Sequence, residues 1–358
     1  MTSPTEPQAR TEMHATFGRP RIAVLGAGLI GCYLGGRLLA GGSDVRLMGR
    51  ESLANELRQA PLKITDWQGG EWIIPSDRVH VSTDPSALAD ADIVLVTVKS
   101  KDTADAASQI AVHGKPSVVV SFQNGVKNGE TLRRQLSSCV LCGMVPFNVT
   151  KPSAGHFHCA SEGTIVLESR PQCDARLCSE FQTAAMAIHL TQQIDAVLWG
   201  KLLMNLNNAI NALAGIPLRE ELSQRGYRLV LARSIREGLL ATRRAGIRPA
   251  KTSRLSPRLL PLLLSLPDWL FTRLAGAVLQ IDPTARSSMW EDLERKRPTE
   301  IQYLNGEIVA LAEHHGISAP TNRGIVELIA QAERNADGSP RLSADALIAA
   351  LRGDQTAA

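Results

Sequence analysis

The sequence predicts an α/β fold in which a doubly wound parallel sheet is followed by an all-helical C-terminal domain. Short apolar runs alternate with helical patterns from residue 21 to about residue 190. After about Gln192 the strand-like runs stop, and helical periodicity continues from Val197 to Ala332. A chain of 358 residues, 44% of them hydrophobic and 21% charged, is long enough for two domains with separate cores.

The first strand–helix unit contains a glycine motif typical of dinucleotide binding. The apolar run that begins at Arg21 is followed by Gly26-Ala27-Gly28-Leu29-Ile30-Gly31, with the spacing G-x-G-x-x-G, and a helix is expected from Leu29 to Ala40. Gly26 permits the tight turn, Gly28 lets the backbone approach a pyrophosphate, and Gly31 lets helix and strand pack closely. We interpret residues 21–191 as a Rossmann-type domain; the alternative is a glycine-rich turn without a ligand.

The end of the second expected strand bears on the choice of dinucleotide. NAD-binding units place Asp or Glu there, about 20 residues after the glycines, to bind the ribose hydroxyls. This chain has Met48-Gly49-Arg50 instead. A guanidinium group suits a phosphate, so we predict NADP (NADPH) as the cofactor, with a solvated loop arginine as the alternative.

Further segments complete the predicted organisation. Residues 1–20 are expected to form a disordered leader, residues 192–334 a helical substrate-binding and catalytic domain, and residues 335–358 a polar, weakly helical tail. Gly163–Glu168 is expected to add an antiparallel strand at the sheet edge. The other expected strands are Ile22–Leu25, Val45–Met48, Val79–Ser82, Ile93–Val98, Ser117–Phe122 and Val140–Val145.

Charge and hydropathy exclude several classes of protein. A net charge of +4 spread along the chain gives no reason to expect nucleic-acid binding. Prolines and charges interrupt the apolar stretch Leu259–Leu279, which predicts a buried or partner-facing helical pair and no membrane span. The leader lacks the apolar core of a secretory signal, so we expect a cytoplasmic protein. A cationic cluster is interpreted as a solvated loop, with an anion-facing surface as the alternative; it comprises Arg243, Arg244, Arg248, Lys251, Arg254 and Arg258.

The six cysteines are expected to stay reduced, without a disulfide framework. Cys139 and Cys142 form a C-x-x-C pair, but residues three apart on a strand point to opposite faces, which argues against a redox or zinc role. His156 and His158 share a strand face with no further ligand in view, so no metal site is predicted.

The helical domain opens with polar residues on an apolar helix. Lys201, Asn205 and Asn208 have the spacing i, i+4, i+7 and share one face. Burying an unpaired lysine costs free energy, and asparagine is a poor helix former. This face is therefore a candidate site, and the alternative is an exposed polar stripe. Ser288 and Glu300 each stand at an expected helix start, where the residues alone indicate capping.

Several blocks of the chain together resemble the ketopantoate reductase (2-dehydropantoate 2-reductase) family. In the order of that family, over roughly residues 21 to 330, they are Gly26–Gly31, Val96-Thr-Val-Lys99, Gln123-Asn124-Gly125, Gly200-Lys201 with Asn205, Ser287-Ser288-Met289 and Thr299-Glu300-Ile301. The resemblance implies an NADP-dependent oxidoreductase acting on a CH–OH group. The reaction implied is reduction of 2-dehydropantoate to (R)-pantoate, a step toward pantothenate and coenzyme A.

The resemblance also implies residue roles. Lys201 matches the catalytic lysine that protonates the developing alkoxide, and Glu300 matches a glutamate beside substrate, cofactor and that lysine. Asn124 matches an asparagine near the nicotinamide and the lysine, and Lys99 a loop lysine near the cofactor. Asn205 and Ser288 match substrate-binding residues, Ser288 that for the carboxylate.

One departure concerns the substrate. Ala209 stands where the family often has a second asparagine, so Asn208 or Asn211 must take its place. The chain also has extra apolar sequence around residues 257–281. Three alternatives therefore stay open: a reductase of another 2-oxo acid, an opine-type dehydrogenase, and a non-catalytic NADPH-sensing protein. The expected partner is a small-molecule 2-oxo acid; a homodimer is left open.

Overall fold

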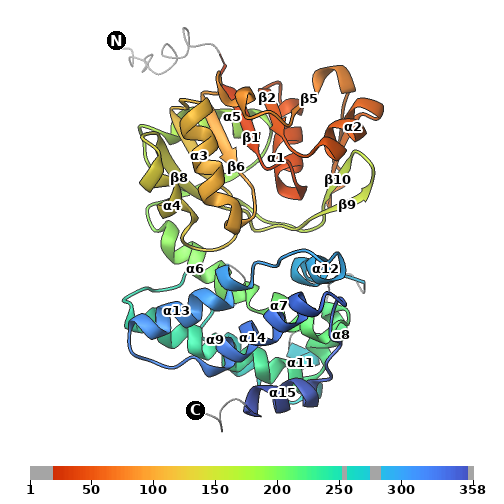
Figure 1. Ribbon diagram of the computed structural model, residues 1–358, viewed down its shortest axis with the longest axis vertical. Coiled ribbons are helices and arrows are strands. Elements are labelled where there is room, and N and C mark those ends of the chain that lie inside the picture. The colour runs from red at the N-terminus through yellow and green to blue at the C-terminus, as the bar shows by residue number, and fades with distance from the viewer. Residues whose placement is uncertain (1–18, 252–255, 275–283, 354–358) are drawn as a thin grey trace, which may run out of the picture.

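The computed structural model describes residues 19–251, 256–274 and 284–353, which form a sheet domain and a helical domain (Figure 1). The expected leader lies almost entirely outside the described residues. The main sheet has the strand order β12-β11-β8-β7-β6-β1-β2-β5. Its strands are β1 (Arg21–Leu25), β2 (Asp44–Met48), β5 (His80–Ser82), β6 (Ile93–Val96), β7 (Val118–Ser121), β8 (Cys139–Met144), β11 (Ile165–Glu168) and β12 (Ile188–Thr191).

The strand register fixes where the loops emerge. Ile22 of β1 pairs with Val45 of β2 and with Ile93 of β6, all in parallel, so the carboxyl ends of these strands meet at one sheet edge. β11 runs antiparallel to β8, as expected, but it is not the edge strand, because β12 pairs in parallel on its other side. The doubly wound sheet and its predicted central strands are therefore confirmed. The helices of this domain are α1 (Leu29–Ala40), α2 (Glu51–Gln59), α3 (Thr103–His113), α4 (Asn128–Gln135) and α5 (Asp174–Thr183).

A second, four-stranded sheet was not predicted. It has the order β4-β3-β10-β9, made of β3 (Leu62–Asp66), β4 (Glu71–Ile74), β9 (Val149–Ser153) and β10 (His156–Cys159). This sheet packs on α1, whose residues Gly31 to Leu39 are all buried. Burial on both sides explains why α1 is apolar all round. His156 and His158 are half-buried on β10 and both lie 2.8 Å from the Thr65 hydroxyl.

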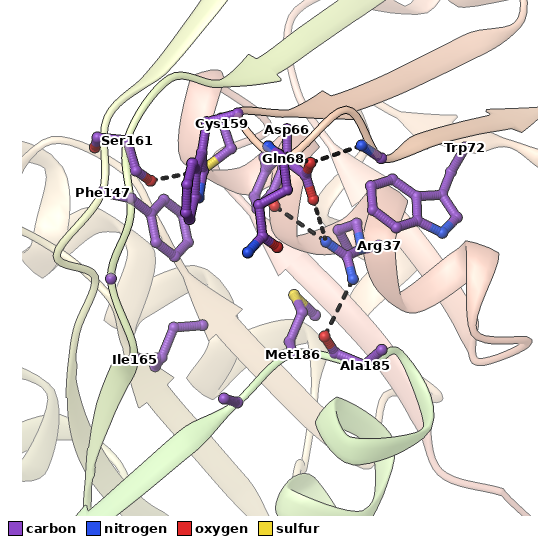
Figure 2. Close-up of a pocket in the computed structure, with 15 residues that line it drawn as sticks. Arg37, Asp66, Gln68, Trp72, Phe147, Cys159, Ser161, Ile165, Ala185 and Met186 are labelled. Atoms are coloured by element: carbon purple, nitrogen blue, oxygen red, sulfur yellow. Dashed lines mark hydrogen bonds and ion pairs between the residues drawn. The ribbon is translucent and has the colours of Figure 1, made fainter.

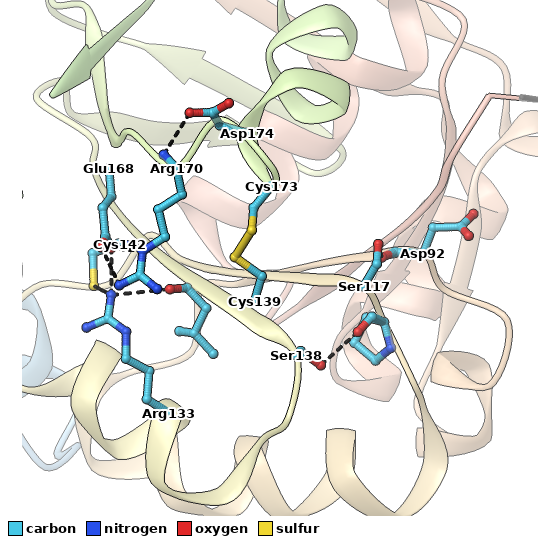
Figure 3. Close-up of a disulfide and its surroundings, with 12 residues drawn as sticks. Asp92, Ser117, Arg133, Ser138, Cys139, Cys142, Glu168, Arg170, Cys173 and Asp174 are labelled. Carbon is cyan, nitrogen blue, oxygen red and sulfur yellow. Dashed lines mark hydrogen bonds and ion pairs between the residues drawn. A yellow bond between two sulfur atoms is a disulfide. The ribbon is translucent and has the colours of Figure 1, made fainter. Parts of the chain in front are cut away.

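The expectation that all cysteines are reduced is wrong for one pair. Cys139, at the start of β8, is disulfide-bonded to Cys173 in the turn before α5 (Figure 3). The sheet order brings these segments together although they are 34 residues apart in sequence. Cys142 is a free thiol packed against Ile194 and Leu198, in a different cluster from Cys139, so the C-x-x-C pair does point to opposite faces.

The helical domain is built around one long central helix, α9 (Arg225–Arg244). Around it lie α6 (Ile194–Asn205), α7 (Asn207–Ala214), α8 (Leu218–Ser223), α10 (Leu260–Leu264), α11 (Asp268–Leu274), α12 (Ser288–Glu294), α13 (Asn305–His314), α14 (Pro320–Asn335) and α15 (Ala344–Gly353). α6 and α12 lie on the side that faces the sheet domain (Figure 1). Leu347 and Leu351 of α15 are buried in this core, so the segment expected as a tail contributes to it.

The described part of the apolar segment after residue 257 forms the expected helical pair, α10 and α11, and residues 275–281 of that segment lie outside the described residues. Pro261, Leu264 and Phe271 are buried, whereas Leu262 and Trp269 are exposed. The pair is fixed by Arg228 of α9, which is fully buried, donates to the carbonyls of Leu264 and Leu266 and forms an ion pair with Asp268. In the described part of the chain, no helix is long and apolar enough to cross a membrane.

Candidate active site

The glycine turn leaves room for a ligand above the start of α1. Gly26 has φ +104°, and a Cβ there would lie 2.5 Å from the Val98 nitrogen. A Cβ on Gly31 would lie 2.5 Å from the Gly26 oxygen, whereas one on Gly28 would meet nothing closer than 3.9 Å. No side chain caps the N-terminus of α1. Open space beside uncapped amide groups fits the pyrophosphate of a dinucleotide.

Arg50 follows β2 and occupies the N-cap position of α2. Its side chain is exposed and has no ion-pair or hydrogen-bond partner among the described residues. The Gly49 nitrogen donates to the Ser82 carbonyl at 3.1 Å, which fixes the turn against the neighbouring strand. This placement leaves the guanidinium group available to a phosphate at the strand end.

A buried polar network positions Asn124 beyond the end of β7. The side-chain amide of Gln123 donates to the Val98 carbonyl at 3.1 Å and to the Thr103 hydroxyl at 2.7 Å. The Asn124 carbonyl accepts hydrogen bonds from Ser100 Oγ at 2.7 Å and from Asn128 Nδ2 at 2.5 Å. Ser100, Thr103 and Asn128 were not predicted from the sequence, although they lie close in the chain to Lys99 and to Gln123-Asn124-Gly125.

Glu300 connects the two domains. Its Oε1 accepts from the Ser100 backbone N–H at 2.9 Å, and its Oε2 accepts from Asn124 Nδ2 at 3.4 Å. The turn before it is held by Thr299, whose backbone N–H donates to Glu333 of α14 at 2.7 Å. The Thr299 hydroxyl accepts from the Ile301 N–H, and Glu300 occupies the N-cap position of the short 3-10 helix Ile301–Tyr303 without a side-chain cap hydrogen bond, so the expected capping role of Glu300 is wrong. The carboxylate of Glu300 instead reaches the sheet domain.

Lys201 is half-buried on α6 at the same junction. Its Nζ donates to the Val145 carbonyl, in the loop after β8, at 2.7 Å. Burial lowers the pKa of the Lys201 ammonium to about 8, and the negative charge of Glu300 partly offsets that decrease. A lysine with a pKa near neutral pH exchanges protons readily, as a general acid must.

The asparagines that follow Lys201 divide into two sets. Asn205 and Asn208 are half-buried, and no side-chain hydrogen bond occupies either of them within the described structure. Asn211 is fully buried, with its Nδ2 donating to Glu221 Oε2 at 2.8 Å and to the Ile216 carbonyl at 2.9 Å. Its Oδ1 accepts from the Ser287 N–H at 2.8 Å. Asn211 therefore cannot replace the missing asparagine.

The helix expected through these residues is divided at Leu206, whose φ of −58° and ψ of −24° stay helical. Ala209, on α7, is completely buried. The position where the family often has an asparagine thus faces the domain core in this chain, and Asn208 is left as the stand-in.

Ser288 does not cap α12, contrary to the capping interpretation. Ser287 does, because its Oγ accepts from the Trp290 N–H at 3.1 Å. Ser287 Oγ also donates to the Asn208 carbonyl at 2.9 Å, which fixes the start of α12 beside α7. Ser288 is the next residue and its side chain is exposed. It is therefore free to contact a ligand.

Lys99 is engaged with the helical domain. Its Nζ forms an ion pair with Asp292 of α12 at 2.6 Å and donates to the Pro298 carbonyl at 3.1 Å. Lys127 and Glu307 form a second ion pair, at 2.7 Å, between the α4 side of the sheet domain and α13. Four of the expected site residues, Lys99, Asn124, Lys201 and Glu300, thus make contacts between the two domains. No such contact links the glycine turn, Arg50, Asn205, Asn208 or Ser288 to the opposite domain among the described residues.

A separate cavity of about 450 Å³ lies in the sheet domain (Figure 2). Arg37 stacks over the Trp72 ring, 3.7 Å from its centroid, and donates to the Tyr33 hydroxyl and the Ala184 carbonyl. Phe147 and Met186 form part of the wall. None of the expected site residues lines this cavity. It is therefore distinct from the interface of Lys201 and Glu300.

Comparison with known proteins identifies the same two parts. Residues 22–172 match the family model described as ketopantoate reductase PanE/ApbA, and residues 193–333 match the one described as ketopantoate reductase PanE/ApbA C terminal. The 2-dehydropantoate 2-reductase of Halobacterium salinarum is 30% identical over 322 residues, covering 88% of this chain and 99% of the relative. That of Archaeoglobus fulgidus is 28% identical over 315 residues, covering 86% and 96%.

Solved structures agree. The crystal structure of a PanE/ApbA family ketopantoate reductase from Ralstonia eutropha JMP134 superposes with a TM-score of 0.76 at 29% identity, covering 88% of this chain and 99% of that one. A D-mandelate dehydrogenase solved with NADH and anilino(oxo)acetate shares the fold, with a TM-score of 0.72 at 18% identity over 88% of this chain and 99% of that one. The chain belongs to the ketopantoate reductase family.

Proposed function

We propose that this protein reduces 2-dehydropantoate to (R)-pantoate, using NADPH as the reductant and Lys201 as the proton donor. The observation that carries the proposal is the ammonium of the half-buried Lys201 on α6, within the electrostatic reach of Glu300, at the interface of the two domains. NADPH, when bound, supplies the hydride to the ketone carbon. Membership of an NAD(P)-dependent reductase family supports the same reaction.

Lys201 has two tasks in this proposal. Its ammonium donates a hydrogen bond to the ketone oxygen and stabilises the negative charge that develops there. It then transfers a proton to the alkoxide, which gives the hydroxyl group of the product and leaves a neutral amine. Solvent returns the proton before the next turnover. Glu300 supports the charged form of Lys201, because its carboxylate raises the pKa of the ammonium.

The remaining residues orient the reactants. Asn205, Asn208 and the exposed Ser288 would bind the substrate, Ser288 at its carboxylate. Asn124, held by Ser100 and Asn128, would lie beside the nicotinamide together with Glu300. The turn Gly26-Ala27-Gly28-Leu29-Ile30-Gly31 would bind the pyrophosphate, and Lys99 would lie near the cofactor. Lys99 can contact a ligand only by sharing or leaving its ion pair with Asp292.

Arg50 is the proposed determinant of NADPH over NADH. It has no partner among the described residues, and no carboxylate stands at this strand end to repel a 2′-phosphate. Removing the guanidinium group by Arg50→Ala should raise KM for NADPH by about tenfold and leave KM for NADH nearly unchanged. Equal KM values for both cofactors in the unaltered enzyme would contradict this role.

The experiment that tests the proposal is an NADPH oxidation assay on a panel of 2-oxo acids that includes 2-dehydropantoate. The highest kcat/KM is expected for 2-dehydropantoate. A clear preference for another 2-oxo acid would instead support the second candidate function, a reductase of that other acid. The buried Ala209 and the inward-facing Asn211 favour this alternative. NADPH binding without turnover on any member of the panel would overturn the enzymatic proposal.

A further inference from the structure

A groove in the helical domain has the composition of a binding site, and the proposed reaction does not use it. Its volume is about 960 Å³, and its described lining comes from the second half of α9, the turn that follows it, and the start of α10. Leu239, Leu240, Ile247 and Leu262 are among its apolar residues. Four arginines also line it, namely Arg236, Arg243, Arg248 and Arg258.

The positive charge of this groove is not balanced by the protein. Arg236 donates to the Ser265 hydroxyl at 3.0 Å. Arg243, Arg248 and Arg258 are exposed and have no hydrogen-bond or ion-pair partner in the described parts of the chain. No Asp or Glu occurs in residues 238–267. Like charges gathered without counter-charges repel one another, so an anion would relieve that repulsion.

The acids that flank this stretch in the sequence are already engaged elsewhere. Glu237 accepts hydrogen bonds from the backbone N–H groups of Thr321 and Asn322, at 2.8 and 2.9 Å. Asp268 is paired with the buried Arg228 at 2.9 Å. Neither acid lines the groove. The described lining of the groove therefore contains no acidic residue, and an anionic ligand would meet arginines alone.

We propose that this groove binds a small anionic amphiphile. A phosphate or carboxylate head group would lie among Arg243, Arg248 and Arg258, where guanidinium groups offer charge-assisted hydrogen bonds. An apolar chain would cover Leu239, Leu240 and Leu262 and remove their surface from water. The volume falls within the range of sites for small molecules, about 300–1,000 Å³. A second copy docked here about a two-fold axis would bring two sets of unpaired arginines together, which disfavours that occupant.

Calorimetric titration of the full-length protein with monomeric dodecyl phosphate tests the assignment. Inorganic phosphate serves as a probe of the head group alone and dodecyl maltoside as a probe of the chain alone. Dodecyl phosphate should bind at least about tenfold more tightly than either, because only it satisfies both the arginines and the apolar wall. Equal affinities for dodecyl phosphate and inorganic phosphate would overturn the proposal of an amphiphilic ligand, since the apolar residues of the groove would then contribute nothing to binding.

A matched pair of variants locates the site. The double variant Arg243→Gln, Arg248→Gln should weaken dodecyl phosphate binding by roughly tenfold or more. The control Arg233→Gln, Arg244→Gln removes the same charge from exposed arginines of α9 that do not line the groove, and should change the affinity less than about twofold. Equal weakening by both variants would show unspecific attraction and overturn the proposal.

Two further measurements separate this proposal from other outcomes. Sedimentation with phosphatidylglycerol vesicles, without binding of monomeric dodecyl phosphate, would replace the small ligand by a bilayer surface and overturn the assignment. Lys201→Ala should bind dodecyl phosphate as the unaltered protein does, because Lys201 does not line the groove. Failure of the catalytic proposal and failure of this one are therefore distinguishable.

Discussion

Lys201 and Glu221 are two titratable residues of the helical domain, the first half-buried and the second fully buried, and loss of solvation displaces the pKa of each to about 8. Their surroundings differ. Lys201 donates to a carbonyl of the sheet domain and interacts with Glu300, so it lies at an interface between domains. Glu221 is enclosed in the helical domain and accepts hydrogen bonds from Asn207 and Asn211. A pKa shifted by burial therefore indicates catalysis only when the group borders a surface that a ligand can reach.

The asparagines that lie between Lys201 and Glu221 in the sequence differ in the same way. Asn205 and Asn208 are half-buried without side-chain partners among the described residues, as ligand-binding groups must be. Asn207 and Asn211 point to Glu221 and help to fix α7 against α8. One short segment thus serves two purposes on its two faces.

The largest effect is expected from Lys201→Ala. Loss of the general acid should lower kcat by on the order of a hundredfold or more. Steady-state NADPH oxidation measures the rate, and NADPH affinity and the melting temperature serve as controls for the fold. A kcat within about threefold of the unaltered enzyme, with the fold intact, would show that Lys201, like Glu221, has no catalytic role.

The second effect concerns pH. In the proposed mechanism Lys201 can donate a proton only while it is charged, and its pKa is about 8, so kcat should fall about tenfold per pH unit above that value. Lys201→Arg keeps its charge at all accessible pH values and should give a lower but flat profile between pH 7 and 9.5. If the decline persists in that variant, another group is titrating.

Glu221→Gln is expected to change stability and to leave catalysis intact. The folded-state pKa of Glu221 is about 8, above its ordinary value of 4.5, so the folded protein binds an extra proton between those values. The free energy of unfolding should therefore decrease as pH rises from about 5 to 8. The glutamine variant lacks this pH-dependent loss, and its stability relative to the unaltered protein should increase by roughly 3 kcal/mol between pH 5 and 8.

Denaturant unfolding at pH 5, 6.5 and 8 measures this difference, and kcat at 25 °C is the control. Parallel pH dependences in both proteins would show that Glu221 is already ionised in the folded state. A large decrease in kcat would show that Glu221 contributes to catalysis.

The smallest effects come from a pair of asparagine variants on α7. Asn208→Ala should raise KM for the 2-oxo acid several-fold, by about 1 kcal/mol, with an unchanged melting temperature. Asn211→Ala should lower the free energy of unfolding by about 1–3 kcal/mol, because it leaves buried polar groups of Glu221 and Ser287 unpaired, with KM nearly unchanged. If Asn208→Ala instead lowered stability and Asn211→Ala raised KM, the substrate-binding face and the structural face of α7 would have been assigned incorrectly.

Local patterns predicted the central strands and the glycine turn, because a parallel sheet buries continuous apolar runs such as Val118–Ser121. The second sheet was missed because strands such as Val149–Ser153 are mostly exposed and carry little hydrophobic periodicity. The Cys139–Cys173 bond depends on strand order, which a spacing of 34 residues does not reveal.

The sequence predicted which residues belong to the candidate site better than it predicted the hydrogen bonds between them. Helical spacing placed Lys201, Asn205 and Asn208 together, but it could not tell that Asn211 faces Glu221. The contacts of Glu300 with Ser100 and Asn124 join residues about two hundred positions apart, so only the tertiary fold brings them together.

The position of Glu300 has a consequence for protonation. Its carboxylate is held by groups of the sheet domain, while its backbone belongs to the helical domain and its charge raises the pKa of Lys201. Thermodynamic coupling is reciprocal, so a proton on Lys201 must in turn favour the arrangement that keeps Glu300 near. Docking of the two domains and protonation of Lys201 are therefore linked through two opposed effects: the charge of Glu300 favours the ammonium, whereas burial, the larger of the two, favours the neutral amine.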